Sequence, residues 1–326
     1  MEYTTLGRTG LSVSRLVLGT MNFGPHTTEA DSHALMDAAH GHGINFFDTA
    51  NTYGGDGLTE EIIGRWLAKG GRREKTVLAT KLYGSTGDWP NEGRLSALNV
   101  RHAAEASLRR LGTDHIDLYQ MHHVDRQTPW EEIWEGFEVL RQQGKVLYFG
   151  SSNFAGWHLA QAQEAAKSRH FLGLVAEQSL YNLANRFIEL DVLPAAKHYG
   201  IGVIPWSPLS SGILGGVLAK ISRGESARHD AWAGPELLRR HRPQVEAYEA
   251  LCERRGLNPA DLALAWLLSR EGVTGPIIGP RTAEQLAGSL RAFDVDLDGD
   301  LLAELDTIFP PPGPNGDKPA PEAYSW

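Results

Sequence analysis

The sequence predicts an α/β protein that folds as one closed (β/α)8 TIM-type barrel domain over residues 1–326. Eight short apolar runs alternate with longer amphipathic segments, and the first seven runs recur at intervals of roughly 28 to 39 residues, the length of a strand, a crossover helix and two loops. An open doubly wound sheet is the competing fold, but it usually carries a GxGxxG motif after its first strand. The corresponding segment here, LVLGTMNFG, has no such motif. The closed barrel is therefore favoured.

The eight strands are expected at the apolar runs, with helices between them. In chain order the runs are RLVLG from Arg15, INFFD from Ile44, TVLATK from Thr76, HIDLYQMH from His115, KVLYFGSS from Lys145, LGLVAEQ from Leu172, GVIPWS from Gly202 and VTGPIIG from Val273. Amphipathic patterns of helical period cover residues 31–42, 58–69, 96–111, 130–143 and 155–168. Each helix is expected to cross over between two strands of the barrel.

Three segments depart from a plain barrel. Residues 1–14 contain short extended pieces around Gly7 and Gly10, which predict a β-hairpin ahead of the first barrel strand. Residues 209–242 form a long connection between the seventh and eighth strands, and we expect a loop that covers the cofactor. Residues 310–326 are rich in proline and glycine, which is typical of a C-terminal tail rather than of a further domain.

Composition excludes several classes of function. The chain carries a net charge of −9 with scattered acidic residues, so no basic stripe is available to bind a nucleic-acid backbone. Cys252 is the single cysteine, which excludes an internal disulfide and any metal site made of several cysteines. No apolar run is long enough to span a bilayer, and the N-terminus lacks a leader pattern. We therefore expect a cytoplasmic protein whose partners include neither nucleic acid nor a membrane.

Polar side chains stand where the strands end, at the mouth where barrel enzymes have their active sites. A packed core would end in valine, isoleucine or leucine at these positions. The residues are Asp48, Lys81, His122, Ser152, Asn153, Gln178 and Trp206. Period-two alternation places Gln120 and His122 on the inward face of the fourth strand and turns His123 away from it. We therefore expect His122, rather than His123, to take part in chemistry.

Asp48, Lys81 and Tyr53 indicate a proton-transfer site. A charged lysine in a largely buried mouth needs a paired carboxylate, which Asp48 provides. The Lys81 ammonium is expected to stabilise a phenolate and so to lower the pKa of the Tyr53 hydroxyl from its reference of roughly 10. Tyr53 would then be a general acid that protonates an oxygen as this oxygen becomes negative.

Seven motifs, in order and over nearly the whole chain, resemble those of the aldo-keto reductase superfamily. They are FFDTANTYG, VLATK, LYQMHHVD, FGSSNF, AEQSLYN, PWSPL and IIGPRTAEQL. The opening LGRTGLSVSRLVLGTMNFG is most similar to bacterial reductases related to potassium-channel β subunits. The resemblance implies a (β/α)8 barrel that binds NADPH without a Rossmann fold and reduces aldehydes or ketones to alcohols by hydride transfer, as a carbonyl reductase or alcohol dehydrogenase does.

The resemblance also implies catalytic roles. Asp48, Tyr53, Lys81 and His122 match the family's catalytic tetrad. Tyr53 would donate the proton to the carbonyl oxygen, with Lys81 lowering its pKa and Asp48 holding Lys81. His122 would orient the carbonyl group and assist the transfer, and no metal is implied.

A coenzyme site is implied in the same way, with NADPH or NADP+ preferred and NADH bound more weakly. Ser152, Asn153 and Gln178 match the residues that bind the nicotinamide carboxamide, and Trp206 takes the place of the aromatic residue that stacks on nicotinamide. The other coenzyme residues are expected to be Gly19, Thr20, Met21, Ser207, Pro208, Leu209, Ser211, Gly212, Gly279, Arg281, Gln285 and Ser289.

Within that set, Arg281 and Gln285 are implied at the 2′-phosphate and Ser289 near the adenine. The family often has a Glu-Asn pair where Gly288 and Ser289 stand, so this chain departs from the pattern there.

The substrate is expected to be a small-molecule carbonyl compound. Phe23, Tyr83, Trp89 and His123 are the candidate contacts, an aromatic mouth suited to planar or apolar carbonyls. Two other functions stay open: a cofactor-binding regulatory subunit with incidental redox turnover, and a barrel lyase that uses Lys81 as a Schiff-base amine. The sequence leaves the substrate, the direction of the reaction and a homo-oligomeric state open.

Overall fold

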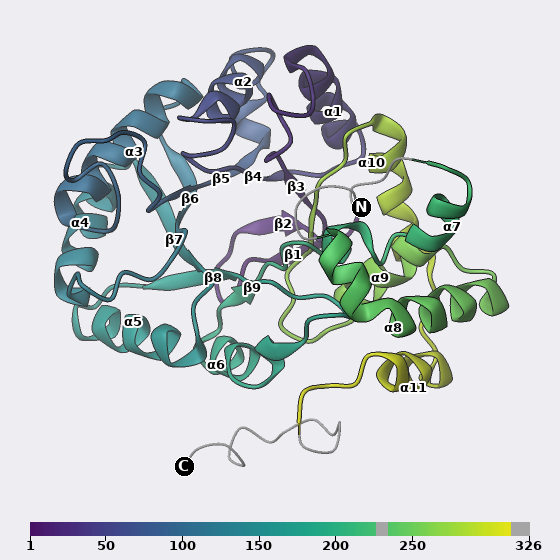
Figure 1. The fold of residues 1–326 in the computed structure, drawn as a ribbon. Coiled ribbons are helices and arrows are strands. Elements are labelled where there is room, and N and C mark those ends of the chain that lie inside the picture. The colour runs from purple at the N-terminus through teal and green to yellow at the C-terminus, as the bar shows by residue number, and fades with distance from the viewer. Residues whose placement is uncertain (226–233, 314–326) are drawn as a thin grey trace.

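The computed structural model describes residues 1–225 and 234–313, and these form a (β/α)8 barrel (Figure 1). Eight parallel strands make one sheet in the order β10-β3-β4-β5-β6-β7-β8-β9. In chain order the strands are β3 (Val17–Gly19), β4 (Phe46–Asp48), β5 (Val77–Leu82), β6 (Ile116–Met121), β7 (Val146–Ser152), β8 (Leu174–Gln178), β9 (Gly202–Val203) and β10 (Ile277–Ile278). The predicted fold is confirmed.

Backbone hydrogen bonds close the ring between β9 and the segment ahead of β10. The Val203 amide donates to the Gly272 carbonyl at 3.0 Å, and the Thr274 amide donates to the Val203 carbonyl at 2.8 Å. Both end strands are shorter than the apolar runs that predicted them, with two residues each. Pro205 and Pro276 explain this difference, because proline has no amide proton for a ladder hydrogen bond.

Helices cover the outside of the sheet (Figure 1). They are α1 (Glu29–Gly41), α2 (Leu58–Leu67), α3 (Ala97–Leu111), α4 (Trp130–Gln142), α5 (Gly156–Ser168), α6 (Val192–Tyr199), α7 (Val217–Ser222), α8 (Gly234–Arg255), α9 (Pro259–Leu268), α10 (Ala283–Leu290) and α11 (Gly299–Ile308). Single helices α1 to α6 connect consecutive strands from β3 to β9, as the crossover rule requires. Helix α10 packs against α1, so the ring of helices closes as the ring of strands does.

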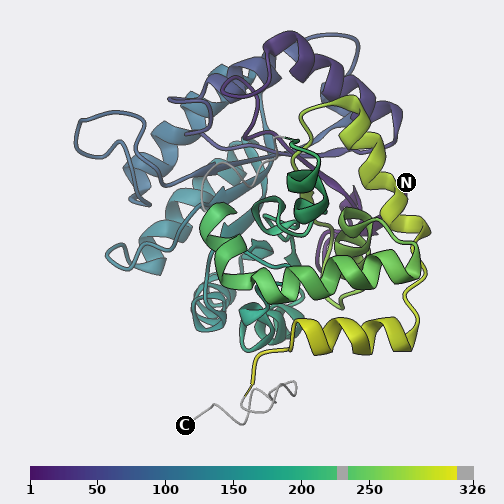
Figure 2. The ribbon, with the colours of Figure 1, turned by 45° about the vertical axis from the view of Figure 1, so that its right-hand side comes forward.

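The connection from β9 to β10 is long, as expected, but its described part is largely helical. The segment 209–242 contains a 3-10 helix (Ser210–Gly212), α7 and the beginning of α8, whereas residues 226–233 lie outside the described part. Helix α8 continues through Pro243, and the backbone at His241 leaves helical geometry two residues earlier. Figure 2 shows α8 in green beside α11 in yellow, and these helices are in contact. The expectation of a simple loop missed these helices.

The expected N-terminal hairpin is present, with β1 (Tyr3–Thr5) paired antiparallel to β2 (Ser12–Ser14). Leu6 and Val13 of this hairpin are fully buried in the apolar cluster that includes Phe46 and Leu118 of the barrel strands. Gly7 adopts φ 55°, and a Cβ there would lie 2.6 Å from two backbone carbonyl oxygens. The hairpin therefore packs against the barrel with a backbone contact at Gly7 that is too close for any other residue.

The C-terminal part of the chain extends the barrel by one helix. Helix α11 ends at Ile308, and of the expected tail 310–326 only residues 310–313 are described. No helix within residues 1–225 and 234–313 is both long and apolar enough to cross a bilayer.

Candidate active site

The strand ends bring the candidate catalytic side chains together at one mouth of the barrel. Asp48 is the last residue of β4, Lys81 lies near the end of β5, and His122 directly follows β6. Tyr53 comes from the turn between β4 and α2. Because the strands are parallel, their carboxyl ends open on the same side of the barrel.

Lys81 is the centre of this group. Its side chain has no exposed surface, and its ammonium donates to Asp48 Oδ2 at 2.6 Å, to the Thr49 carbonyl at 2.8 Å and to the Tyr53 hydroxyl at 3.2 Å. Burial by itself lowers the pKa of Lys81, but the negative Asp48 and the Tyr53 oxygen outweigh it, and the pKa is raised. The lysine therefore stays charged, with all three protons used inside the chain.

The pKa of Tyr53 moves against the expected direction. Burial raises the pKa of the Tyr53 hydroxyl above its ordinary value, and the neighbouring Lys81 ammonium offsets this effect only in part. The expectation of a lowered pKa is therefore wrong, because desolvation of the phenolate is the larger effect. Tyr53 is a neutral hydroxyl with its proton in place, which is the form that a general acid needs.

His122 is a neutral imidazole beside this hydroxyl. Burial lowers the pKa of His122 to about 3, and the electrostatic interactions with Lys81 and His123 act in the same direction. The His122 ring meets the Tyr53 ring edge-on, with a centroid separation of 6.0 Å. A neutral imidazole at this position has one N–H donor available without adding a positive charge to the site.

His123 does not turn away from His122 as strand alternation predicted. The two rings stack, with centroids 5.3 Å apart and an angle of 9° between their planes. Strand β6 ends at Met121, so the period-two rule no longer governs these two residues. His123 is exposed and also meets the Tyr83 ring edge-on at 5.4 Å, which places it on the rim of the mouth.

The amide side chains at the ends of β7 and β8 are fixed by hydrogen bonds within the chain. Gln178 Nε2 donates to Asp48 Oδ1 at 2.8 Å, so its carbonyl oxygen is turned away from Asp48. Asn153 Oδ1 accepts from Trp206 Nε1 at 3.0 Å, and Asn153 Nδ2 donates to Ser152 Oγ at 3.0 Å. Asn153 Nδ2 also donates to the His122 carbonyl at 3.4 Å, so both of its protons are used. The Gln178 carbonyl oxygen remains as an acceptor for the NH2 group of a carboxamide.

The turn after β9 holds serines in a strained conformation. Ser207, Ser210 and Ser211 have φ of 53°, 48° and 54°, a backbone conformation that residues other than glycine rarely adopt. The Ser211 amide donates to Ser207 Oγ at 3.2 Å, and Asn182 Nδ2 donates to the Ser207 carbonyl at 2.9 Å. Such strain is concentrated at functional sites. Of the other candidates in this turn, Pro208 is buried, whereas Leu209 and Gly212 are partly exposed.

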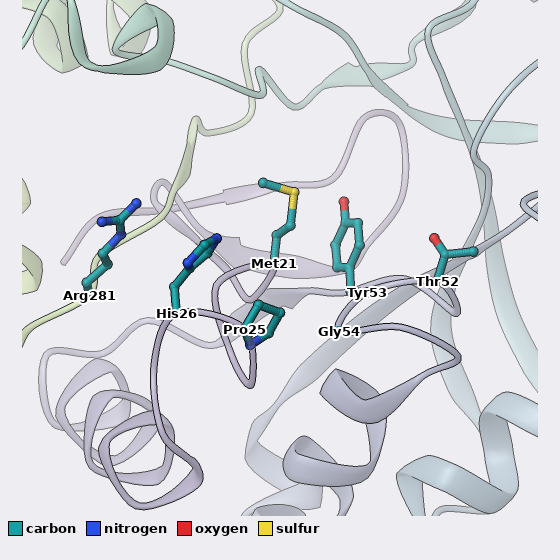
Figure 3. Close-up of a pocket in the computed structure, with 7 residues that line it drawn as sticks. All are labelled: Met21, Pro25, His26, Thr52, Tyr53, Gly54 and Arg281. Atoms are coloured by element: carbon teal, nitrogen blue, oxygen red, sulfur yellow. The ribbon is translucent and has the colours of Figure 1, made fainter. Parts of the chain in front are cut away.

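Arg281 lies on the same pocket as Tyr53. Figure 3 shows Tyr53 toward one end of this pocket and Arg281 at the other, with Met21, Pro25 and His26 between them. Thr52 and Gly54 complete the lining. The pocket therefore connects the proton-transfer group with a guanidinium, as an elongated anionic ligand would require.

The segment after β10 is arranged around the start of α10. Thr282 caps the helix by accepting from the Gln285 amide at 3.2 Å. The Gln285 side chain accepts from the Arg281 amide at 2.8 Å, and Ser289 Oγ donates to the Gln285 carbonyl at 3.1 Å. Gly279 accepts from Asn22 Nδ2 at 3.1 Å, which joins this segment to the turn after β3.

Several candidates lie away from the pocket surface. Phe23 has no exposed surface and packs in a core cluster of the barrel, so it does not line a substrate site. Gly19 and Thr20 are buried too, and the Thr20 hydroxyl donates to the Asp48 carbonyl at 2.8 Å. Trp89 is 79% exposed. It stands on the outer loop after β5.

Three groups that the sequence did not assign contribute to the site. Gln120 Nε2 donates to Asp48 Oδ1 at 3.0 Å, the Thr49 carbonyl accepts from Lys81, and His26 lines the pocket. The alternation that placed Gln120 and His122 on one face was a signal for Gln120. A backbone carbonyl such as that of Thr49 leaves no signal in a sequence. Within the described residues no cluster of three His, Cys, Asp or Glu side chains is arranged to hold a metal ion.

Comparison with known proteins gives the family. The model of the aldo/keto reductase family matches residues 15–309. The chain is 53% identical to the uncharacterized oxidoreductase YrpG of Bacillus subtilis over the whole length of both proteins. It is 31% identical to the protein Tas of Escherichia coli, covering 94% of this chain and 97% of Tas. A probable voltage-gated potassium channel subunit beta of Oryza sativa subsp. japonica is 33% identical, over 90% of this chain and 92% of that protein. The chain therefore belongs to the aldo/keto reductase family of oxidoreductases.

Proposed function

We propose that the protein is an NADPH-dependent oxidoreductase that reduces the carbonyl group of a small aldehyde or ketone to an alcohol. The observation that carries this proposal is the neutral Tyr53 hydroxyl held at 3.2 Å from the Lys81 ammonium and next to the neutral His122 ring. A proton donor, a fixed positive charge and a hydrogen-bond donor together suit an oxygen that becomes negative in the transition state.

Each side chain has one task in this reaction. The nicotinamide coenzyme, when bound, supplies the hydride. Tyr53 gives its proton to the substrate oxygen, and Lys81 stabilises the phenolate that remains. Asp48 keeps Lys81 charged through its 2.6 Å ion pair. His122 donates a hydrogen bond to the same substrate oxygen. This bond orients the substrate carbonyl toward Tyr53.

The coenzyme is assigned to residues of matching chemistry. Asn153 and Gln178 would hold the carboxamide, with Ser152 beside them and the Trp206 ring against the nicotinamide. The turn of residues 207–212 would cover the pyrophosphate. Arg281 and Gln285 would meet the 2′-phosphate at the N-terminus of α10, where free amide groups favour an anion, and Ser289 would lie near the adenine.

The alternative of a Schiff-base lyase conflicts with the state of Lys81. Its ammonium is charged and engaged by Asp48, Thr49 and Tyr53, whereas a Schiff base needs an uncharged amine. A regulatory subunit is the remaining alternative, since a probable potassium-channel β subunit is among the relatives. That alternative predicts coenzyme binding without efficient turnover.

Turnover of NADPH in the presence of carbonyl compounds tests the proposal. We expect loss of NADPH absorbance with at least one class among aromatic aldehydes, dicarbonyls, sugars and ketosteroids. Tyr53→Phe should lower kcat by about a hundredfold or more, because a positioned proton donor is lost, while the Kd of NADPH stays unchanged. Tyr119→Phe is the matched control, since it removes a buried hydroxyl from the outer core cluster. Turnover by Tyr53→Phe near the wild-type rate would refute the assignment of the acid.

A further inference from the structure

A fully buried carboxylate lies behind the amide side chains of the proposed coenzyme site. Glu177 precedes Gln178 on β8 and has no exposed surface. Alternation along the strand turns it to the face opposite to Gln178. Within residues 1–225 and 234–313 no lysine, arginine or histidine forms an ion pair with it. The proposed mechanism gives this group no task.

Hydroxyl and amide groups surround the Glu177 carboxylate in place of a cation. Its Oε1 accepts from the Ser179 hydroxyl at 2.7 Å and from the Phe154 amide at 3.1 Å, and its Oε2 accepts from the Ser151 hydroxyl. These three donors come from two different strand ends, β7 and β8. One side chain therefore ties these two strand ends together.

Each donor is the chain neighbour of a residue assigned to the carboxamide. Ser151 precedes Ser152, Phe154 follows Asn153, and Ser179 follows Gln178. The backbone between them is also strained, because Asn153 adopts φ 60° while its amide donates to the Gln178 carbonyl at 3.0 Å. The bond from the Phe154 amide to Glu177 holds the residue directly after this strained position.

We propose that Glu177 is a positioning residue for the coenzyme carboxamide. Its carboxylate holds the turn of residues 152–154 against the end of β8, so that Asn153 and Gln178 face the ligand together. This inference rests on the proposed coenzyme site. Hydrogen bonds to a charged carboxylate are stronger than those to a neutral acid, so the turn is held most firmly when Glu177 is ionised.

The ionisation of Glu177 falls within the range of ordinary assays. Burial raises the pKa of Glu177 to about 7, although the hydrogen bonds from Ser151, Ser179 and the turn amides act in the opposite direction. A protonated carboxyl group has one oxygen that donates a hydrogen bond, and the present partners of Glu177 are all donors. Protonation of Glu177 therefore weakens its hold on the turn of residues 152–154. Coenzyme affinity should therefore rise as the pH increases through about 7.

Other titratable groups lie on the elements next to β8, namely β7 and α5, and in the turn ahead of α6, and they belong in the comparison. They are Tyr148 on β7, His158, Glu164 and Lys167 on α5, and Asp191, which accepts from the Gly156 amide at the start of α5. Burial lowers the pKa of His158, so its ring is neutral at pH 7. None of these groups is altered by a change at Glu177, so they affect variant and wild type alike.

Glu177→Gln provides the test, because it removes the charge and keeps the shape. The amide oxygen can still accept from Ser179 and Phe154, and the Ser151 hydroxyl can rotate to accept from the new NH2 group. We would measure the Kd of NADPH for wild type and variant at several values from about pH 6 to about pH 8.5. At the lowest pH the two proteins should bind within about twofold of each other, and at the highest wild type should bind about tenfold more tightly, the effect of one charge-assisted hydrogen bond.

Two further variants sharpen the result. Glu164→Gln removes an exposed charge from α5 and should reproduce the wild-type pH dependence. Ser179→Ala removes one donor and should give an intermediate loss of affinity at high pH, which keeps the test informative if Glu177→Gln folds poorly. The titration of the coenzyme phosphate cancels, since the same ligand is compared in each protein.

The possible outcomes separate this inference from the proposed function. A ratio of Kd values between Glu177→Gln and wild type that is equal at both ends of the pH range would overturn the positioning role. A ratio of the variant's Kd to the wild-type Kd that grows as the pH rises through about 7, because only the wild type tightens with ionisation of Glu177, would support it. Failure of the wild-type protein to bind NADPH or NADH at any pH would overturn the coenzyme proposal, and this inference with it.

Discussion

The imidazole of His122 should make the free energy of unfolding depend on pH, and substitution of His122 should remove this dependence. Burial, with help from Lys81 and His123, lowers the pKa of His122 from 6.5 to about 3. In the unfolded chain the ring titrates near its ordinary value, so between these two values the unfolded state binds one proton more than the folded state. The free energy of unfolding therefore falls with falling pH, by about 2 kcal/mol at pH 5 and by about 4 kcal/mol at pH 3.

His122→Asn keeps a polar side chain and removes this titration. We would measure urea unfolding by tryptophan fluorescence at about pH 7.5, 6 and 5, for wild type and variant. The variant should gain about 2 kcal/mol relative to wild type between the first and the last of these values. His123→Asn, which removes the adjacent exposed ring, is the matched control and should follow wild type. A constant difference between His122→Asn and wild type over the whole range would refute the desolvated, neutral imidazole.

Three other substitutions test separate parts of the structure. His122→Ala should lower kcat far more than His123→Ala, because only His122 lies beside Tyr53, and equal losses would contradict the assigned roles. Arg281→Ala should abolish a preference for NADPH over NADH of about tenfold to a hundredfold, measured as the ratio of the two Kd values, since a guanidinium bond to phosphate contributes roughly 1.5–3 kcal/mol. Gly7→Ala should lower the free energy of unfolding by more than about 1 kcal/mol, because its Cβ would meet two carbonyl oxygens at 2.6 Å; unchanged denaturant midpoints would show that the hairpin adjusts.

The proximity of Asp48 and Lys81 could be predicted from the sequence because it depends on strand geometry. Asp48 and Lys81 stand at the ends of neighbouring parallel strands, and their 2.6 Å ion pair follows from the shared direction of those strands. Gln178 could be placed on the same grounds. Gln120 was placed on the correct face, but nothing in a single sequence shows that its amide reaches Asp48 across the barrel.

Other features depend on tertiary contacts that the chain pattern does not contain. The turn after β3 folds back so that the Phe23 amide donates to the Thr20 carbonyl, and the Phe23 ring enters the core and not the mouth. The raised pKa of Tyr53 arises from desolvation, which exists only once the mouth is formed. The rings of His122 and His123 stack because the strand has already ended, which alternation along the sequence does not reveal.

The interior of the barrel is divided into two layers, and this division links catalysis to folding. Each of four strands contributes an apolar residue to the lower layer and, two positions later, a polar residue to the upper layer: Phe46 and Asp48, Ala79 and Lys81, Leu118 and Gln120, Ala176 and Gln178. Within the upper layer Asp48 accepts from Lys81 through one oxygen and from two amides through the other.

The charge of Lys81 is thus compensated by the fold itself, so the hydrogen bonds around Asp48 and Lys81 are in place before any ligand binds. The same arrangement limits how the site can change. Removal of Asp48 alone would leave a fully buried ammonium without its counter-charge, which typically costs about 3–5 kcal/mol of stability. Substitution of the charged pair by neutral residues must therefore change Asp48 and Lys81 together. Such a change to the site is at the same time a change to the barrel core.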